Sequence, residues 1–177
     1  YSGLLTLFPA LQADLAYAVE GYTNTYGNIW RWDILPTNTE VEAVYGTLNA
    51  LIGKCNFLLE RIAVLEQEVD DEDYEKLQQF KGEALFARAL SYSDLIKMYC
   101  KAYDPATAAD ELGVVLVSSY SNAGTLKRAS LKDSYQFVLD DLAQSATCLK
   151  PDENENDESY YDTLYFTIYA VNALYAR

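Results

Sequence analysis

GEALFARALSYSDLIKMYCKAY, which occupies residues 82–103, is the most informative stretch of this chain. Its apolar residues recur every three to four positions, and this spacing predicts one long helix over residues 72–102. Gly82 costs a helix about 1 kcal/mol relative to Ala, so we expect a neighbouring helix to approach closely there. Glu83 and Arg88 interrupt the apolar face. Because a charge on a packed face needs a partner, we expect a buried ion pair or hydrogen bonds to a loop rather than catalysis.

Helical periodicity continues upstream of this stretch. The clearest apolar stripe predicts a helix over residues 40–66, with Thr39 as its N-cap. Another helical run covers residues 2–20. Pro9 lies within it and marks either a kink or the start of a new helix.

Two further helices are predicted downstream. Ser130 followed by Asp133 resembles a capping box and predicts a helix start, with the helix covering residues 131–149. The last helix, over about 160–177, has no later helix to pack against. We therefore expect its apolar face to meet another molecule or a segment beyond this chain.

The connections between these helices are long and irregular. Residues 21–39 are rich in Gly, Asn and Thr and are predicted to form a loop. Residues 103–129 are predicted to form a connection with one short extended piece at the run of valines from Val114 to Val117. The prediction is thus an all-α chain, with residues 1–177 forming a single helical domain.

Composition excludes several classes of function. The 177 residues include 13 Lys and Arg against 27 Asp and Glu, a net charge of −14, which disfavours binding to nucleic acid or anionic lipid. The absence of His excludes His-based triads and His metal sites. Cys55, Cys100 and Cys148 form no CxxC pair, so we expect small buried side chains and neither a metal nor a disulfide framework. No phosphate-binding loop is present, no cofactor is expected, and no run of about 18 apolar residues could span a membrane.

The clustered carboxylates give little indication of a calcium site or a catalytic site. Residues 152–156 match the first ligand positions of a calcium loop, but Asp157 and Thr163 stand where such a loop needs Gly and Glu. The run 70–73 and the pair Asp140–Asp141 could serve as acids or bases only in a cleft. We expect all of these acidic groups to be solvated.

The segment that most suggests a binding site is the aromatic loop. It contains Tyr22, Tyr26, Trp30 and Trp32, with Asn28 among them. Aromatic rings in a flexible loop are costly to expose unless they bind something, and they stack on the apolar faces of sugar rings. Two alternatives stay open: these residues bind a sugar, or the loop folds back and buries Trp30 or Trp32 in the core.

Several motifs, in order and at consistent spacing, resemble the SusD/RagB family of outer-membrane proteins. Residues 82–103 are similar to the family's central signature, in which a GEA-x-F-x-RA helix is followed by a Tyr and an Asp-Leu step. LGVVLV at residues 112–117 is similar to the extended piece that comes next. The remaining matches run in the family's order: Tyr45 with Asn56 to Ile62, then Arg128, Ser130 and Tyr135, then Asp141–Leu142, Ala146 and Leu149–Lys150–Pro151, and finally Tyr169–Ala170, Ala173–Leu174 and Ala176–Arg177.

This resemblance implies a SusD-like N-terminal domain, built on tetratricopeptide-like helix pairs with long irregular loops. It implies a lipoprotein at the cell surface, anchored in the outer membrane through an N-terminal lipid that this chain does not contain. It also implies a partner, a SusC-like TonB-dependent transporter, and the capture of glycans or other nutrients without catalysis. Family members are longer than 177 residues, so we expect this chain to be the N-terminal part of a longer protein. The family's ligand residues are poorly shared, so the resemblance implies no particular ligand residue in this chain.

Two other hypotheses about function remain to be compared with the nutrient-binding one. A generic helical-repeat module that binds a protein partner would explain the helix pairs, but such repeats have a period near 34 residues and regular connections. A carboxylate enzyme such as a glycosidase needs two carboxylates about 5–10 Å apart across a cleft. The sequence favours a nutrient-binding subunit, with the helical-repeat module as the alternative.

Overall fold

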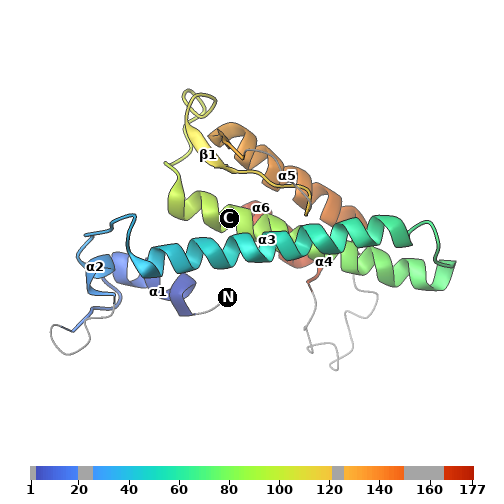
Figure 1. Cartoon of the computed structure of the whole chain (residues 1–177), viewed down its shortest axis with the longest axis horizontal. Coiled ribbons are helices and arrows are strands. Elements are labelled where there is room, and N and C mark those ends of the chain that lie inside the picture. Colours follow the sequence, from blue (N-terminus) through green and yellow to red (C-terminus); the bar gives the residue numbers. More distant parts are fainter. Residues whose placement is uncertain (1–2, 20–25, 121–125, 150–165) are drawn as a thin grey trace. The chain divides into compact units, whose positions relative to one another are not determined.

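The computed structural model describes residues 3–19, 26–120, 126–149 and 166–177 (Figure 1). The chain divides into two compact units, Tyr1–Leu48 and Asn49–Arg177. Both are mainly helical. Helix α3 (Thr39–Leu65) contributes its first residues to one unit and the rest to the other.

The first unit contains helix α1 (Gly3–Gln12) and the one-turn helix α2 (Gly27–Trp30), which pack against each other. Phe8, Leu11 and Ile29 are buried here. The helix predicted over residues 2–20 is shorter than expected and runs through Pro9 without a break.

The early end of α1 has a local cause. Asp14 adopts a left-handed φ of 56°. The amide of Leu15 then donates to the carbonyl of Ala10 at 2.9 Å, and that of Asp14 to Leu11 at 3.4 Å. These two bonds are the Schellman pattern, which satisfies the last carbonyls of a helix and stops it.

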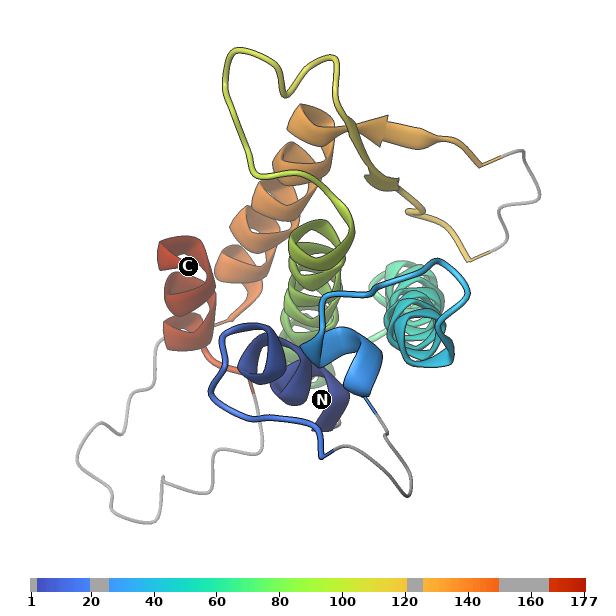
Figure 2. The ribbon, with the colours of Figure 1, turned by 90° about the vertical axis from the view of Figure 1, so that its left-hand side faces the viewer.

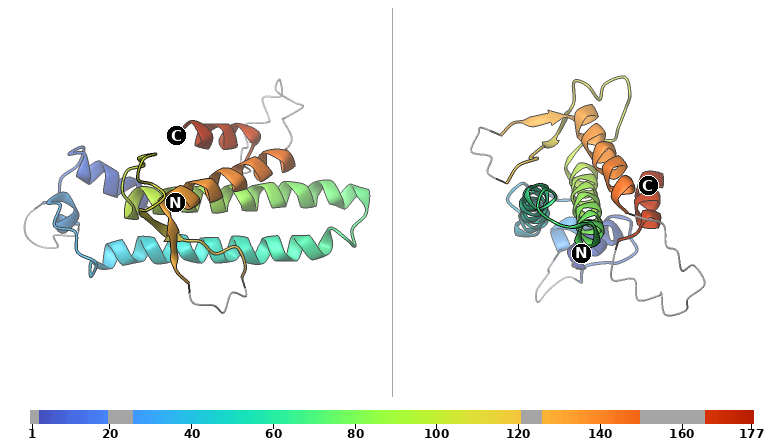
Figure 3. Two further views of the ribbon diagram at one scale, coloured as in Figure 1. Left: turned by 90° about the horizontal axis from the view of Figure 1, so that it is seen from above. Right: turned by 90° about the vertical axis from the view of Figure 1, so that its right-hand side faces the viewer.

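The second unit is built around helix α4 (Asp71–Tyr99). Figure 2 shows α4 with the part of α3 from Asn49 onward on one side and α5 (Leu131–Cys148) on the other, and Figure 3 shows that this part of α3 runs antiparallel to α4. Helix α6 (Ile168–Ala176) packs on α5, with Val171 fully buried. The last helix, which we expected to lack a partner within the chain, thus has one.

The starts of α4 and α5 each have a side-chain cap of the kind that the capping rules favour. Asp70 accepts from the amide of Asp73 at 3.1 Å, and Ser130 accepts from the amide of Asp133 at 3.0 Å, so the predicted cap at Ser130 is confirmed. Thr39 is not an N-cap. It is the first residue of α3, and its hydroxyl donates to the carboxylate of Glu40.

The connection between α4 and α5 contains two strands where one extended piece was expected. Strand β1 (Leu112–Val115) pairs antiparallel with β2 (Arg128–Ser130), with a register shift between Leu112 and Val115. Gly113 has no room for a side chain, because a Cβ there would meet the Ser134 hydroxyl and the Ser130 carbonyl. The sheet therefore lies directly against the start of α5.

Gly82 marks a close helix contact, as its position in an apolar face predicted. A Cβ at Gly82 would lie 2.7 Å from the Leu149 side chain and 3.0 Å from the Cβ of Cys148. The Ser145 hydroxyl donates to the Gly82 carbonyl at 2.8 Å. Glycine at this position allows α5 to come close enough for the Ser145 side chain to bond the backbone of α4.

The remaining structural expectations concern thiols and membranes. All three cysteines are free; Cys55 is buried, while Cys100 and Cys148 are half-buried. In the part of the chain that the structure describes, no helix combines the length and hydropathy needed to cross a bilayer. The calcium-like loop at 152–156 lies outside the described residues.

Candidate functional site

A buried polar network joins the helices of the second unit. The Arg88 guanidinium donates from Nε and Nη2 to the two carboxylate oxygens of Asp141, at 2.7 Å each. Its Nη1 donates to the Asn56 amide oxygen, also at 2.7 Å. The expected partner for Arg88 therefore exists, and Asp141 corrects one expectation, because it is only 2% exposed rather than solvated. The spacing of apolar residues did not indicate this burial, because Asp141 is a charged residue. It nevertheless lies on the buried face of α5.

Electrostatics explains why this network is structural. Burial raises the pKa of Asp141, while the hydrogen bonds and charge of Arg88 lower it. Burial also raises the pKa of the Cys55 thiol, and Arg88 opposes that shift. The Arg88 guanidinium lies over the Phe137 ring at 5.2 Å. Each charge is thus already compensated within the core.

The network also fixes the long connection after α4. Asn56 donates from its amide nitrogen to the Val117 carbonyl at 2.8 Å. The Tyr92 hydroxyl accepts from the Val117 amide at 2.8 Å and donates to its carbonyl at 3.2 Å. Because Arg88 orients Asn56, the position of residue 117 depends on the buried ion pair.

The other charged side chains singled out from the sequence have structural surroundings. The Glu83 carboxylate accepts a hydrogen bond from the side-chain amide of Gln79 at 2.7 Å, within α4. Asp70 caps α4, and Asp73 pairs with Lys76 at 3.2 Å on the surface. Among the described residues, no group of three or more acidic or cysteine side chains could hold a metal ion.

The aromatic loop is placed in the first unit by α2. Ile29 is the buried member, 1% exposed, whereas Trp30 is half-buried and Trp32 is 65% exposed. The loop has not folded either tryptophan into the core, because Ile29 occupies that place. Tyr26 is half-buried and precedes α2, and Tyr22 lies outside the described residues.

The backbone of this loop has two unusual conformations. Tyr26 and Trp32 have left-handed φ values of 69° and 59°. Such conformations are rare for bulky residues and occur often at binding sites, where the surrounding structure holds them. The amide of Trp32 donates to the Ile29 carbonyl at 3.1 Å, and that of Asp33 to the Asn28 carbonyl at 2.8 Å. These bonds hold the backbone that carries the exposed Trp32 side chain.

Two polar side chains next to the tryptophans in sequence, Asn28 and Arg31, are hydrogen-bonded to each other. The Asn28 side-chain oxygen accepts from Nη2 of Arg31 at 3.2 Å at the exposed surface. A pair at the surface exchanges readily with other partners, since it is worth little in free energy.

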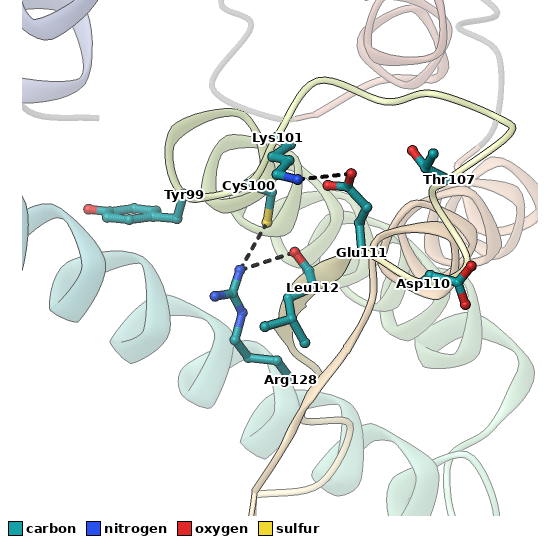
Figure 4. A pocket seen from close by; sticks show the side chains of 8 residues that line it. All are labelled: Tyr99, Cys100, Lys101, Thr107, Asp110, Glu111, Leu112 and Arg128. Carbon is teal, nitrogen blue, oxygen red and sulfur yellow. Dashed lines mark hydrogen bonds and ion pairs between the residues drawn. The ribbon is translucent and has the colours of Figure 1, made fainter.

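The second unit contains an open pocket of about 700 Å³ that the sequence did not reveal. It lies between the end of α4 and the β1–β2 sheet, and Lys101 meets Glu111 across it at 3.0 Å (Figure 4). Arg128 donates to the carbonyls of Gly113 at 2.6 Å and Leu112 at 3.1 Å. The pairing of β2 with β1 places Arg128 there. The pocket is lined by Tyr99, Cys100, Lys101, Thr107, Asp110, Glu111, Leu112 and Arg128.

The cationic side chains of the pocket already have partners. Its cations, Lys101 and Arg128, bind a carboxylate and backbone carbonyls within it. Burial raises the pKa of the Cys100 thiol, which Arg128 approaches at 3.8 Å and shifts the other way. This arrangement stabilises the sheet against the end of α4 and presents no activated nucleophile.

Comparison with known proteins decides the family. The family model described as "SusD-like_3: Starch-binding associating with outer membrane" matches residues 10–177.

The chain belongs to the SusD-like family.

Solved structures agree with this SusD-like assignment at the level of the fold. A SusD superfamily protein from Bacteroides fragilis superposes with a TM-score of 0.74 at 22% identity, covering 96% of this chain and 38% of that protein. One from Bacteroides thetaiotaomicron gives 0.71 at 21%, covering 92% and 32%. A structure described as a laminarin-binding SusD-like protein gives 0.63 at 15%, covering 97% and 37%. No curated protein matches the chain.

These matches establish the fold, and they also show how much of each related protein this chain covers. The fold is the mostly helical, tetratricopeptide-like fold of SusD-like proteins, as the motif order implied. The chain spans about a third of the length of the SusD-like structures that it matches.

Proposed function

We propose that this protein is a non-catalytic, glycan-binding subunit of an outer-membrane uptake complex of the SusC/SusD type. The observation that carries the proposal is the family match over residues 10–177, whose description names starch binding in association with the outer membrane. A structural relative described as laminarin-binding supports the same class of ligand. Starch and laminarin are both neutral glucans, so a neutral glycan is the ligand that these observations favour.

The ligand surface that we propose is the aromatic loop of Tyr22, Tyr26, Asn28, Trp30 and Trp32. Trp32 supports it most, because its ring is 65% exposed while its backbone is fixed by hydrogen bonds. A sugar ring would stack its C–H face on the indole, and Asn28 would bond a hydroxyl beside it. A backbone held in place before binding loses little conformational freedom when the ligand arrives.

Binding without chemistry fits the charges that the structure describes. Catalytic carboxylates need a cleft and a perturbed pKa. Asp141 is neutralised by Arg88 in the core, and Asp70 caps α4. The proposal therefore assigns no catalytic residue and no cofactor.

The partner in this proposal is a SusC-like TonB-dependent transporter. The protein would be held at the cell surface by an N-terminal lipid anchor outside this chain. The family's description supports an association with the outer membrane. The net charge of −14 argues against nucleic acid as a partner.

Affinity electrophoresis tests the ligand class. The natural protein is run through native gels that contain laminarin or soluble starch, beside gels without polysaccharide. We expect retardation by at least one of the two, and a rise in Kd of about tenfold for Trp32→Ala, as for loss of an aromatic anchor. Trp30→Ala, at a half-buried ring, should weaken binding less. Normal migration in both polysaccharides would overturn the proposal and leave the protein-binding helical module as the better account.

A further inference from the structure

A second exposed aromatic pair lies in the Asn49–Arg177 unit. Phe57 on α3 and Tyr120 in the connection after β1 meet edge to face, with ring centroids 5.1 Å apart and an interplanar angle of 67°. Both rings face solvent, Phe57 being 43% exposed and Tyr120 61%. Large aromatic side chains gathered at the surface mark binding sites more often than scattered apolar residues do.

Charged groups on α3 flank this pair. The Arg61 guanidinium lies over the Phe57 ring at 5.2 Å. Stacking of this kind leaves the in-plane N–H groups of arginine free to donate sideways. Glu60 lies one residue away and binds the connection directly. Oε1 of Glu60 accepts from the Tyr120 amide at 2.7 Å and from the Ser119 hydroxyl at 2.8 Å.

The position of Tyr120 is fixed by the buried core. Glu60 holds residues 119 and 120, and three residues earlier Val117 is held by Asn56 and Tyr92. Asn56 in turn accepts from Arg88. The two aromatic rings are therefore carried by a helix and by a hydrogen-bonded stretch of backbone, so that little backbone freedom is lost when a ligand binds.

We propose that Phe57, Glu60, Arg61 and Tyr120 form a second glycan-binding surface, here called the Phe57–Tyr120 platform, for a neutral polysaccharide. The aromatic rings supply faces for stacking, Arg61 supplies donors, and the Glu60 carboxylate supplies an acceptor for hydroxyl groups. The chain's charge of −14 makes a neutral polymer a better ligand than an acidic one. This inference rests on the proposed glycan-binding function and adds a second contact, in a different unit from Trp32.

A second edge-to-face pair provides a matched control. Tyr103 and Tyr135 lie 5.0 Å apart at 76°, and Tyr103 is 44% exposed. Tyr103 thus has nearly the same ring geometry and exposure as Phe57. The structure places no arginine over its ring among the described cation–aromatic contacts.

The test measures Kd by titration calorimetry for the natural protein with laminarin and with soluble starch. Tyr120→Ala and Phe57→Ala should each raise the Kd for the bound polysaccharide about tenfold, whereas Tyr103→Ala should change it less than about twofold. Tyr120→Phe keeps the ring and should bind nearly as the unmodified protein does. Circular dichroism melting checks that each variant is folded, which is expected because the replaced rings are exposed.

The outcomes separate this inference from the proposed function. If Trp32→Ala weakens binding while Tyr120→Ala and Phe57→Ala do not, the platform is wrong and the glycan-binding function stands. An equal loss for Tyr103→Ala would also contradict the platform, because any exposed aromatic pair would then have the same effect. If the unmodified protein binds neither polysaccharide, both proposals fail.

Discussion

Arg88 of α4 and Asp141 of α5 are joined by two parallel hydrogen bonds of 2.7 Å, and both side chains are buried. The same guanidinium binds Asn56 of α3, so one side chain links three helices. Asn56 continues the link to the Val117 carbonyl and hence to the connection that carries Tyr120. The core of the second unit is thus connected, through Asn56 and the backbone from Val117 to Tyr120, to the Phe57–Tyr120 platform.

Arg88→Met should destabilise the protein severely. It leaves the Asp141 carboxylate buried without its partner, which costs about 3–5 kcal/mol of unfolding free energy. The double variant Arg88→Met/Asp141→Leu should recover part of that loss, because apolar pairs replace buried ion pairs well. Urea denaturation measures each free energy.

Lys101→Met is the matched control for this prediction. It breaks an ion pair of 3.0 Å with Glu111, in which the lysine is mostly exposed, and should cost less than about 1 kcal/mol. An Arg88→Met variant no less stable than Lys101→Met would contradict the structural role of Arg88.

Gly82→Ala should destabilise the contact between α4 and α5. The added methyl would lie 2.7 Å from the Leu149 side chain, and overpacking of this kind costs about 1–3 kcal/mol. Gly53→Ala on α3 is the control, since a Cβ there meets nothing within 4 Å and Ala favours the helix by about 1 kcal/mol. In thermal melting, the Tm should therefore fall for Gly82→Ala and rise for Gly53→Ala. A rise in Tm for both would show that the helices do not approach at Gly82.

The Glu66–Lys81 pair should make stability depend on pH. Glu66 accepts from Lys81 and Gln78, at 2.7 and 2.6 Å. The Lys81 hydrogen bond lowers the pKa of Glu66, and the same bond raises the pKa of Lys81. The carboxylate's contribution is thus present above its unfolded pKa, near about 4.3, and is lost as the pH falls through the lower folded value. The lysine's contribution is lost only as the pH rises through its raised folded pKa.

Glu66→Gln measures this contribution. The variant should be less stable than the unmodified protein by up to about 1 kcal/mol at neutral pH, and the difference should shrink below about pH 4. Urea denaturation across the pH range provides the comparison, with Lys76→Gln, at a more exposed pair, as the control. A difference that stays constant down to pH 3 would show that Glu66 is not held by Lys81.

Tryptophan fluorescence should report glycan at the aromatic loop. The chain contains two tryptophans, both in this loop, and Trp32 is the exposed one. The difference in emission between the unmodified protein and Trp32→Phe isolates Trp32, and the same subtraction with Trp30→Phe isolates Trp30. Saturating laminarin or soluble starch should protect Trp32 from acrylamide quenching more than Trp30. Equal quenching with and without a polysaccharide that binds would place the ligand elsewhere.

Local sequence rules predicted much of the fold. The spacing of apolar residues gave α3, α4 and α5 nearly to their ends, and Ser130 with Asp133 gave the start of α5. Gly82 gave the close helix contact. These features depend on neighbours along the chain, and such signals are visible in the residues themselves.

Features that depend on distant residues were missed. Strand β2 pairs with β1, and Arg128 of β2 bonds two carbonyls of β1 that lie 15 and 16 residues away in sequence. The burial of Asp141 was not predicted, because it depends on a partner, Arg88, that lies 53 residues earlier in the sequence. The Phe57–Tyr120 contact likewise joins a helix to a loop that only Glu60, Asn56 and Tyr92 hold in place.

For the candidate site, the sequence suggested the aromatic loop, which stays a prediction, and left its arrangement open. Composition could not decide whether a tryptophan or another residue fills the core position. The structure assigns that position to Ile29 and leaves Trp32 exposed, through left-handed conformations at Tyr26 and Trp32 that no sequence rule predicts for such residues.

The most direct test of the central claim is to purify the natural protein with its partners. The tagged protein is extracted from its own cells with mild detergent, and mass spectrometry identifies the proteins and any lipid attached to it. We expect a large TonB-dependent β-barrel to copurify with a lipid-bearing protein. A soluble cytoplasmic partner together with a bait that carries no lipid would contradict the uptake-complex account.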